Sequence, residues 1–315
     1  MKAMNPDLTI CSLLPSATEI VFALGRGDRL VAVTHECDFP AEAAGLPVIT
    51  RSTLDHGTHG SREIHNHIAG AVHAGSSIYA LDQTLLERLN PDVILTQELC
   101  DVCAVSYDAV QAAVRRLDGP RTLLSLEPIS LGSILETIEQ VGDAVRAPER
   151  AAAVVEQLRR GIDETAALVT AASSRPRVFA MEWLDPPFTA GHWVPEMIRV
   201  AGGRDDLAQE GRPSSQVTWD RIVEYDPEIV VLMPCGFGLE RTMEEYAHIT
   251  LPDAWQRLNA VRAGRVYAVD GSAYFNRPGP RVVQGLRILG EIIHPECVVP
   301  TLSAAWRRVA GRPAQ

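Results

Sequence analysis

Residues 148–172, PERAAAVVEQLRRGIDETAALVTAA, form the stretch around which the rest of this chain is organised. Apolar residues recur in it close to a helical period, with charged residues between them, as is typical of an amphipathic helix. Pro148 suits the first helical turn, because the N–H that proline lacks would have no partner there. About 25 helical residues give a rod of roughly 35–40 Å, which is about the length of a domain. The stretch therefore predicts one long helix between two parts of the chain.

A similar pattern occurs on either side of this helix. Residues 81–97 read LDQTLLERLNPDVILTQ, and residues 217–234 read VTWDRIVEYDPEIVVLMP. Each consists of an amphipathic helix, then Asn-Pro or Asp-Pro, then an acid, then an apolar strand. Both helices are expected to end before the proline, because the preceding residue is disfavoured in the α region. The repeat predicts two similar lobes. The alternative is that an x-Pro-acid sequence is a common connection between a helix and a strand and implies no duplication.

Strands and helices alternate through the remaining sequence, which implies parallel sheets flanked by helices. The first strand is expected within residues 8–14 and the first helix at 16–24, with Ser16 and Glu19 forming a capping box. The predicted fold is α/β: two lobes with parallel-rich sheets, joined by one long interlobe helix. Residues 1–130 form the N-terminal lobe, 131–174 the helical segment that includes the interlobe helix, and 175–315 the C-terminal lobe.

Composition narrows the class of protein. The chain is 46% hydrophobic and 22% charged, which is typical of a soluble globular protein. A net charge of −11 argues against nucleic acid or an anionic membrane as partner. No apolar run is long enough for membrane insertion. Pro15, Ser16, Thr18 and Glu19 interrupt the N-terminal apolar run, so the sequence as printed predicts no secretory signal and a cytoplasmic location.

Four loops are candidates for ligand binding, because parallel sheets bind ligands outside the carboxyl ends of their strands. They are residues 35–40 (HECDFP), 97–103 (QELCDVC), 182–188 (EWLDPPF) with Trp193 beyond, and 273–277 (AYFNR). Aromatic residues make up only 5% of the chain, yet these loops concentrate them. Two lobes on a rod should place the loops across a cleft, whose aromatic rim would suit a flat, partly apolar ligand. The alternative is that these side chains only pack the loops.

Two of these loops also carry a possible metal site. His35, Cys37, Cys100 and Cys103 supply one imidazole and three thiols, a ligand set that suits zinc or another transition metal. The Cys-x-x-Cys pair could instead be a redox pair, and cysteines are also commonly buried as small apolar residues. The histidines between residues 56 and 73 are interpreted as a solvated or weakly metal-attracting patch.

Signatures of enzymes are missing from the sequence. It contains no Walker loop, no G-x-S-x-G elbow, no H-E-x-x-H and no dinucleotide fingerprint after a strand. Glu182, beside Trp183, has no identifiable catalytic partner. The sequence therefore predicts a binding protein and no enzyme, and the metal alternative leaves an enzyme built on the His and Cys residues open.

Several segments closely resemble a known family. Residues 9–40, LNPDVILTQ (89–97), PPFTAGHW (186–193) and YFNRPGPR (274–281) resemble the cobalamin- and iron-siderophore-binding components of ABC importers, the class III periplasmic binding proteins. The resemblance extends over nearly the whole chain. HECDFP, LCDVCAVS and AYFNRPGPR are most similar to a branch described as cobalamin-binding. The resemblance implies two α/β lobes on a single long helix, and a corrinoid held between the lobes without chemistry.

The resemblance and the strand-end loops together give the candidate residues. The ligand contacts are His35, Glu36, Cys37, Phe39, Gln97, Glu182, Trp183, Phe188, Trp193, Tyr274, Phe275 and Arg277. In relatives an acidic residue on each lobe docks onto an ABC permease, and the matching residues here are Asp108 and Asp220.

The resemblance also implies an extracytoplasmic location, in conflict with the N-terminal sequence. The cysteines depart from the family pattern, which leaves room for a cobalt–thiolate or cobalt–imidazole contact or a separate metal. An iron-siderophore or haem ligand is the further alternative. An anionic chelate needs cationic groups, and only Arg277 and Arg281 are evident for it.

Overall fold

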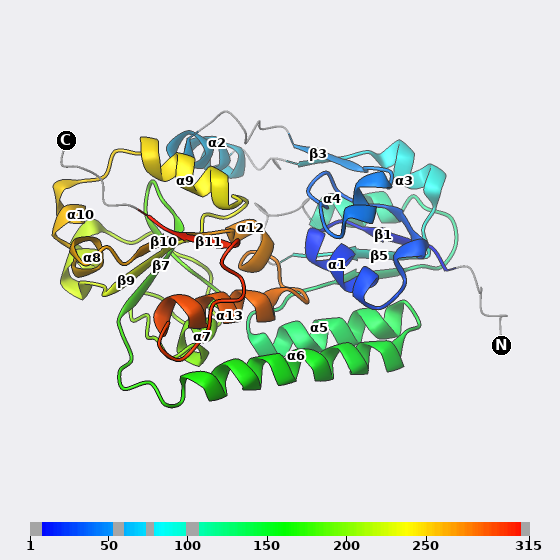
Figure 1. Ribbon diagram of the computed structural model, residues 1–315. Helices are drawn as coiled ribbons and strands as arrows, with labels where there is room; N and C mark the ends of the chain where they lie inside the picture. The colour runs from blue at the N-terminus through cyan, green and yellow to red at the C-terminus, as the bar shows by residue number, and fades with distance from the viewer. Residues whose placement is uncertain (1–7, 53–59, 74–78, 99–106, 310–315) are drawn as a thin grey trace. The chain divides into compact units, whose positions relative to one another are not determined.

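The computed structural model describes residues 8–52, 60–73, 79–98 and 107–309, which fall into two compact units (Figure 1). Of the described residues, unit 1 takes those within Met1–His59, Asn66–Glu127 and Ser133–Gln157. Unit 2 takes Gly60–His65, Pro128–Gly132 and the described part of Leu158–Gln315.

The long helix predicted from the sequence is α6 (Pro148–Val169), which begins at Pro148 as expected. It contributes to both units, since the division falls between Gln157 and Leu158. Helix α5 (Leu131–Ala144) precedes it, and the two run side by side in Figure 1. A Cβ placed on Gly142 of α5 would lie only 2.4 Å from the Cβ of Ala151, so this glycine permits the close approach. Within the described residues, no helix has the length and apolar character needed to cross a membrane.

Unit 1 contains a four-stranded sheet in the order β2-β1-β5-β6, in which every pairing is parallel. One face of this sheet packs on α3 and α4 through a cluster that includes Cys11, Ile94, Leu86 and Val110. A short antiparallel ribbon, β3-β4, is separate from the sheet. The elements are β1 (Ile10–Ser12), α1 (Pro15–Ala23), β2 (Leu30–Ala32), β3 (Thr50–Ser52), β4 (Tyr79–Leu81), α3 (Gln83–Leu89), β5 (Val93–Thr96), α4 (Tyr107–Val114) and β6 (Thr122–Ser125), with α2 (Ser61–His73) between the ribbon strands in the chain.

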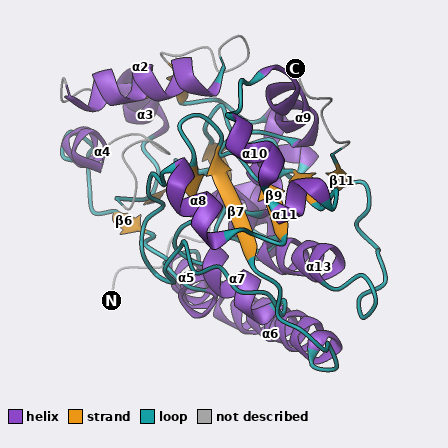
Figure 2. Cartoon of the chain, turned by 90° about the vertical axis from the view of Figure 1, so that its left-hand side faces the viewer, coloured by secondary structure: helices purple, strands orange, loops and turns teal. Residues whose placement is uncertain are grey.

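Unit 2 contains a five-stranded sheet in the order β11-β10-β9-β7-β8. Figure 2 shows β7 and β9 of this sheet surrounded by helices. The three inner strands are parallel, and the two edge strands are antiparallel to them. Its strands are β7 (Val178–Trp183), β8 (Phe188–Thr189), β9 (Ile229–Leu232), β10 (Val266–Val269) and β11 (Trp306–Arg308). Its helices are α7 (Val194–Val200), α8 (Trp219–Tyr225), α9 (Leu239–His248), α10 (Asp253–Arg257), α11 (Asn259–Arg262), α12 (Gly271–Tyr274) and α13 (Val282–Ile293).

Helices cover both faces of the unit 2 sheet, which explains its apolar strand sequences. Phe179 and Met181 of β7 point into a core with helices α8 to α11, centred on the fully buried Trp255. Val178, one residue out of phase, lies on the side of Ile198 in α7 and the C-terminal end of α13. Alternate residues of one strand therefore enter two different cores.

The repeated helix–strand pattern has the same local structure in both units. Helices α3 and α8 begin after side-chain N-caps, Asp82 and Thr218, whose oxygens accept backbone N–H groups of the first turn. Both helices end at the residue before proline, Asn90 or Asp226, each in the left-handed conformation with φ of 44°. Asparagine and aspartate tolerate this conformation better than most residues.

The acid after each proline makes the same contact in the two units, which we call the acid clasp. Asp92 Oδ2 accepts the backbone N–H of Thr9, just before β1, at 2.9 Å. Glu228 Oε2 accepts the backbone N–H of Arg177, just before β7, at 3.0 Å. The backbone N–H groups of the two acids donate in turn to the carbonyls of Thr9 and Arg177. The x-Pro-acid pattern thus joins the amino ends of two neighbouring strands in each unit, as duplication of one supersecondary unit would produce.

A buried carboxylate attaches the C-terminal segment to unit 2. Glu291 of α13 is 1% exposed. Its Oε1 accepts the backbone N–H groups of Thr301 at 2.7 Å and Leu302 at 3.2 Å, and its Oε2 accepts the indole N–H of Trp306 at 2.9 Å. Trp306 opens edge strand β11, so this one side chain fixes the start of that strand.

One local prediction, the capping box of Ser16 and Glu19, was wrong. Helix α1 begins at Pro15 with Leu14 at the N-cap, and no side chain caps it. Ser16 and Glu19 instead lie inside the helix and are buried. Proline at the first helical position places the helix start two residues earlier than the capping box would, because the N-cap is Leu14 and not Ser16.

Candidate functional site

The carboxyl ends of β7, β9 and β10 lie at one edge of the unit 2 sheet, since these strands are parallel. Aromatic side chains follow each of them. Trp183 ends β7, Phe237 follows β9 and Tyr274 ends the helix after β10. The Trp183 and Phe237 rings meet edge to face with centroids 5.5 Å apart, and the Arg241 guanidinium lies 4.8 Å from the Phe237 centroid. Trp183 remains partly exposed, so this edge offers a fixed aromatic surface.

Phe237 was missed by the sequence analysis. It follows β9 in the same way that Trp183 ends β7, so applying the strand-end rule to the third parallel strand would have identified it. Its own side chain is 3% exposed and packs edge to face against the Trp183 ring.

Glu182 holds the loop that follows β7. Its Oε2 accepts the backbone N–H of Gly191 at 3.0 Å. Burial raises the pKa of this carboxyl group, and hydrogen bonds from Gly191 and from the Ser214 side chain partly offset that rise. The candidate acid is therefore already engaged in positioning the segment that carries Phe188 and Trp193.

The predicted aromatic residues divide into buried and accessible ones. Trp193 and Phe275 are 6% and 1% exposed, and the Trp193 indole N–H donates to the Phe275 carbonyl at 3.0 Å. They join two loops from within, as the packing alternative expected. Phe188 and Tyr274 are partly exposed. Arg277 is 7% exposed and donates to Ser272 Oγ at 3.3 Å, so its charge is held inside the loop.

In unit 1, the residues after β2 have differing accessibility. Phe39 is 45% exposed, and its peptide bond to Pro40 is cis. His35 Nδ1 lies 2.8 Å from Thr50 Oγ1, and its ring lies 5.4 Å from that of Tyr79. Glu36 Oε1 lies 3.4 Å from His35 Nε2. Gln97 follows β5 directly, at the same edge of the sheet.

The structure gives no support to the four-ligand metal site. Cys37 is 6% exposed, and its sulfur lies 3.1 Å from Thr18 Oγ1 and 3.2 Å from Thr34 Oγ1. This is the packing role that the sequence left open. Cys100 and Cys103 lie outside the described residues. Within the part of the chain that is described, no three His, Cys, Asp or Glu side chains are grouped so as to hold a metal ion.

The two predicted docking residues occupy different places in the repeat. Asp220 is exposed in the first turn of α8, the helix before β9. Asp108 belongs to α4, the helix after β5, and its side chain lies outside the described set. Asp220 lies six residues before Asp226, and Thr84 of α3 lies six residues before Asn90. Thr84 is therefore the residue of unit 1 that matches Asp220. Docking through Asp108 and Asp220 stays a prediction.

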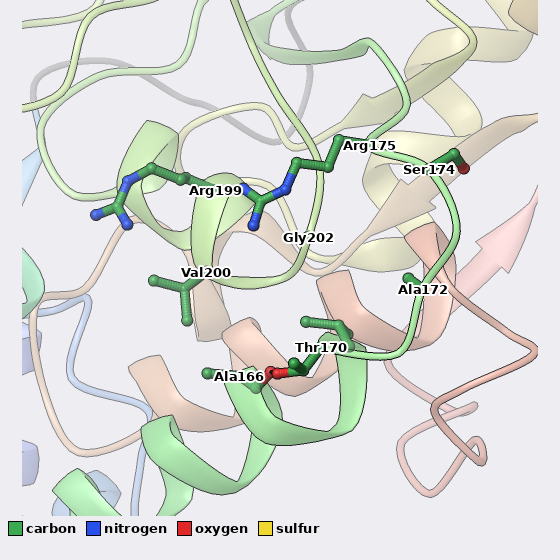
Figure 3. Close-up of a pocket in the computed structure, with 9 residues that line it drawn as sticks. Ala166, Thr170, Ala172, Ser174, Arg175, Arg199, Val200 and Gly202 are labelled. Atoms are coloured by element: carbon green, nitrogen blue, oxygen red, sulfur yellow. The ribbon is translucent and has the colours of Figure 1, made fainter.

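A hollow of about 350 Å³ lies elsewhere on unit 2 (Figure 3). Ala166 of α6 and Thr170, just after that helix, line one side, and Arg175 and Arg199 lie on the other. Arg175 comes just before β7, so the hollow is near the amino ends of the strands. It is therefore distinct from the edge at which parallel sheets bind ligands.

We expect Asp205 to make the stability of unit 2 depend on pH. It accepts the backbone N–H groups of Leu207 and Ala180, and burial raises its pKa from 3.8 to about 7. Since the folded protein binds this proton more tightly than the unfolded chain does, stability is lost as pH rises towards 7. Between pH 5.5 and 8 we expect the free energy of unfolding to fall by about 2 kcal/mol from this group.

Urea denaturation at several pH values measures this dependence. Asp205→Asn should flatten the slope. Asp206→Asn should change it only slightly, because the charge of this exposed neighbour is the smallest of the causes that act on the Asp205 pKa. A wild-type slope retained in Asp205→Asn would show that this carboxyl group does not cause it.

Comparison with known proteins assigns the class. The sequence profile of the family described as periplasmic binding protein matches residues 10–273, and the chain belongs to this family. It is a family of substrate-binding proteins of transport, which confirms the prediction of a binding protein and no enzyme.

Individual relatives support this assignment. An uncharacterized ABC transporter substrate-binding lipoprotein of Bacillus subtilis is 27% identical over 309 residues, covering 93% of this chain and 84% of that protein. The vitamin B12-binding protein of Vibrio cholerae is 25% identical over 285 residues, covering 89% of this chain and 87% of that protein.

Solved structures confirm the predicted fold class. The periplasmic vitamin B12-binding protein of Vibrio cholerae matches with a TM-score of 0.66 and 23% identity, over 91% of this chain and 96% of that one. A periplasmic haem-binding protein of Pseudomonas aeruginosa matches with a TM-score of 0.71 and 20% identity, over 97% and 99%. The zinc alternative gains nothing from these relatives.

Proposed function

We propose that this protein is the substrate-binding component of an ABC importer and that its ligand is a cobalamin-like corrinoid. The observation that carries the proposal is the aromatic edge of unit 2, defined as Trp183, Phe188, Phe237 and Tyr274. Three of these side chains are partly exposed, and the fourth holds Trp183 in place. A fixed aromatic surface suits a large ligand with a flat apolar face.

The arginines at this edge have partners within unit 2, which favours a corrinoid over an anionic iron chelate or haem. Arg62 pairs with Asp185, and Arg241 pairs with Glu245. Arg277 is buried against Ser272, and the Arg281 guanidinium lies 5.6 Å from the centre of the Tyr274 ring. Both cations that the sequence offered to a siderophore are thus engaged within the loop. The vitamin B12-binding relative adds support, since its similarity extends over most of both chains.

The relatives also suggest the setting in which the protein acts. One is described as an ABC transporter lipoprotein and another as a periplasmic protein. An extracytoplasmic location and a permease partner follow for this chain as parts of the proposal.

Titration calorimetry with cyanocobalamin tests the proposal, with haemin and a ferric hydroxamate siderophore as competing probes. We expect cyanocobalamin to bind with a Kd of about 1 μM or tighter, and its visible spectrum to change on binding. If haemin or the siderophore bound more tightly than cyanocobalamin, that compound and not a corrinoid would be the ligand. No heat and no spectral change with any corrinoid would reject the proposal.

Trp183→Ala locates the site in the same experiment. Loss of the exposed indole should weaken cyanocobalamin binding by about tenfold. Trp219→Ala is the control, because Trp219 of α8 packs against Trp255 of α10 and is not one of the residues of the edge. Equal losses in both variants would argue against the aromatic edge.

A further inference from the structure

The start of helix α2 occupies an unexpected place. In the chain, α2 lies between the ribbon strands β3 and β4, which belong to unit 1. Its first residues, Gly60–His65, nevertheless belong to unit 2. We call them the α2 first turn. In Figure 1 the start of α2 lies beside α9, in agreement with the contacts of Ser61.

A buried carboxylate receives the N-terminus of α2. Glu245 of α9 is 6% exposed, and its Oε1 accepts both the backbone N–H and the hydroxyl of Ser61, at 2.8 and 2.6 Å. A carboxylate at a helix N-terminus satisfies a free N–H and complements the helix dipole. Ser61 and Ile64 are each 1% exposed, so this turn is packed into unit 2.

The same turn holds the central residue of the aromatic edge. The Trp183 indole N–H donates to the Ser61 carbonyl at 3.1 Å. The other Glu245 oxygen lies 3.4 Å from Arg241, whose guanidinium covers Phe237, on which Trp183 rests. These contacts close a ring, so the orientation of the indole depends on the α2 first turn.

Two further contacts place the turn over the loop that follows β7. Arg62 forms a two-pronged ion pair with Asp185, with Nε 2.8 Å from Oδ2. The His65 ring lies 5.7 Å from the ring of Phe188, and both side chains are partly exposed. An imidazole nitrogen is therefore available beside an aromatic surface.

We propose that the α2 first turn is a specificity-determining element of the ligand-binding edge. It fixes the Trp183 indole through Ser61 and presents the His65 imidazole to the polar rim of a flat ligand, such as the amide groups of a corrinoid. This inference rests on the proposed function. Trp183 acts on the ligand directly, whereas Arg62 is a positioning residue that acts through the turn.

Reversal of the exposed Arg62 charge tests the inference. Arg62→Glu should repel Asp185 and weaken cyanocobalamin binding by about tenfold. The double charge swap Arg62→Glu with Asp185→Arg should restore the affinity to within about threefold of wild type. Amide hydrogen exchange of residues 61–65 should be faster in Arg62→Glu and slow again in the double variant.

Two controls separate this role from a general effect on folding. Arg62 is 64% exposed, so the midpoint of thermal unfolding should stay within about 2 °C of wild type. Arg204→Glu reverses another exposed ion pair of unit 2, with Asp206, and should leave the affinity unchanged.

His65→Ala should weaken binding by about threefold to tenfold, while His67→Ala, at an exposed position two residues on, should not. If Arg62→Glu bound cyanocobalamin as tightly as wild type, or if Arg204→Glu lost as much affinity as Arg62→Glu, this inference would be wrong while the proposed function would stand. Wild-type protein that binds no corrinoid would overturn the proposed function, and this inference with it.

Discussion

Glu291→Ala is expected to lower the free energy of unfolding by about 4 kcal/mol. The substitution leaves the backbone N–H groups of Thr301 and Leu302 and the indole N–H of Trp306 without their acceptor. Each donor that stays buried without a partner costs about 1–3 kcal/mol, and the Arg287 charge beside the carboxylate loses its counterion. Urea denaturation followed by circular dichroism measures the change.

The matched control is Glu240→Ala. Glu240 also holds β11, through Arg307, but this ion pair is exposed, with side chains 70% and 53% accessible. Its loss should cost less than about 1 kcal/mol. Similar losses in the two variants would show that burial of the Glu291 carboxylate is not the source of its effect.

Gly191→Ala should lower the free energy of unfolding by about 3 kcal/mol. A Cβ at this position would lie 2.2 Å from the backbone nitrogen of Ser214 and 2.8 Å from the carbonyl carbon of Pro213. Backbone atoms of a neighbouring segment have to move to admit it. The movement also disturbs the hydrogen bond from Gly191 to Glu182, so the loop that carries Phe188 loses its support.

Gly45→Ala controls for the change of residue type, since a Cβ at Gly45 has nothing within 4 Å. Its stability should equal or slightly exceed that of wild type, because alanine has less freedom to lose on folding. Thermal unfolding of Gly191→Ala and Gly45→Ala measures the difference in their stability. A Gly191→Ala protein as stable as wild type would show that the segment near Ser214 yields easily.

Much of the fold could be predicted because its signals are local. The period of residues 148–172 predicted α6, and the two x-Pro-acid segments predicted the ends of α3 and α8. Boundaries failed where two local signals competed. Pro15 and Ser16 both mark a helix start, and the proline determined it.

The candidate site was less predictable, because its contacts join residues that are distant in the sequence. Ser61 and Glu245 lie 184 positions apart, and no motif around either residue indicates that the two are in contact. The loop aromatics showed where an edge would form, but not which rings face inwards. Burial of Phe275 and exposure of Tyr274 depend on the packing of the following loop, which a residue pattern does not record.

The acid clasps of Asp92 and Glu228 have a consequence for engineering. They fasten each half at the strand beginnings, whereas the candidate recognition residues follow the strand endings. The contacts that hold the fold together and the residues that would select the ligand thus lie at opposite ends of the strands. We therefore expect that loops after the strands can be exchanged for those of a haem-binding homologue without loss of the contacts at the strand beginnings. Ligand preference could then be changed by loop exchange alone.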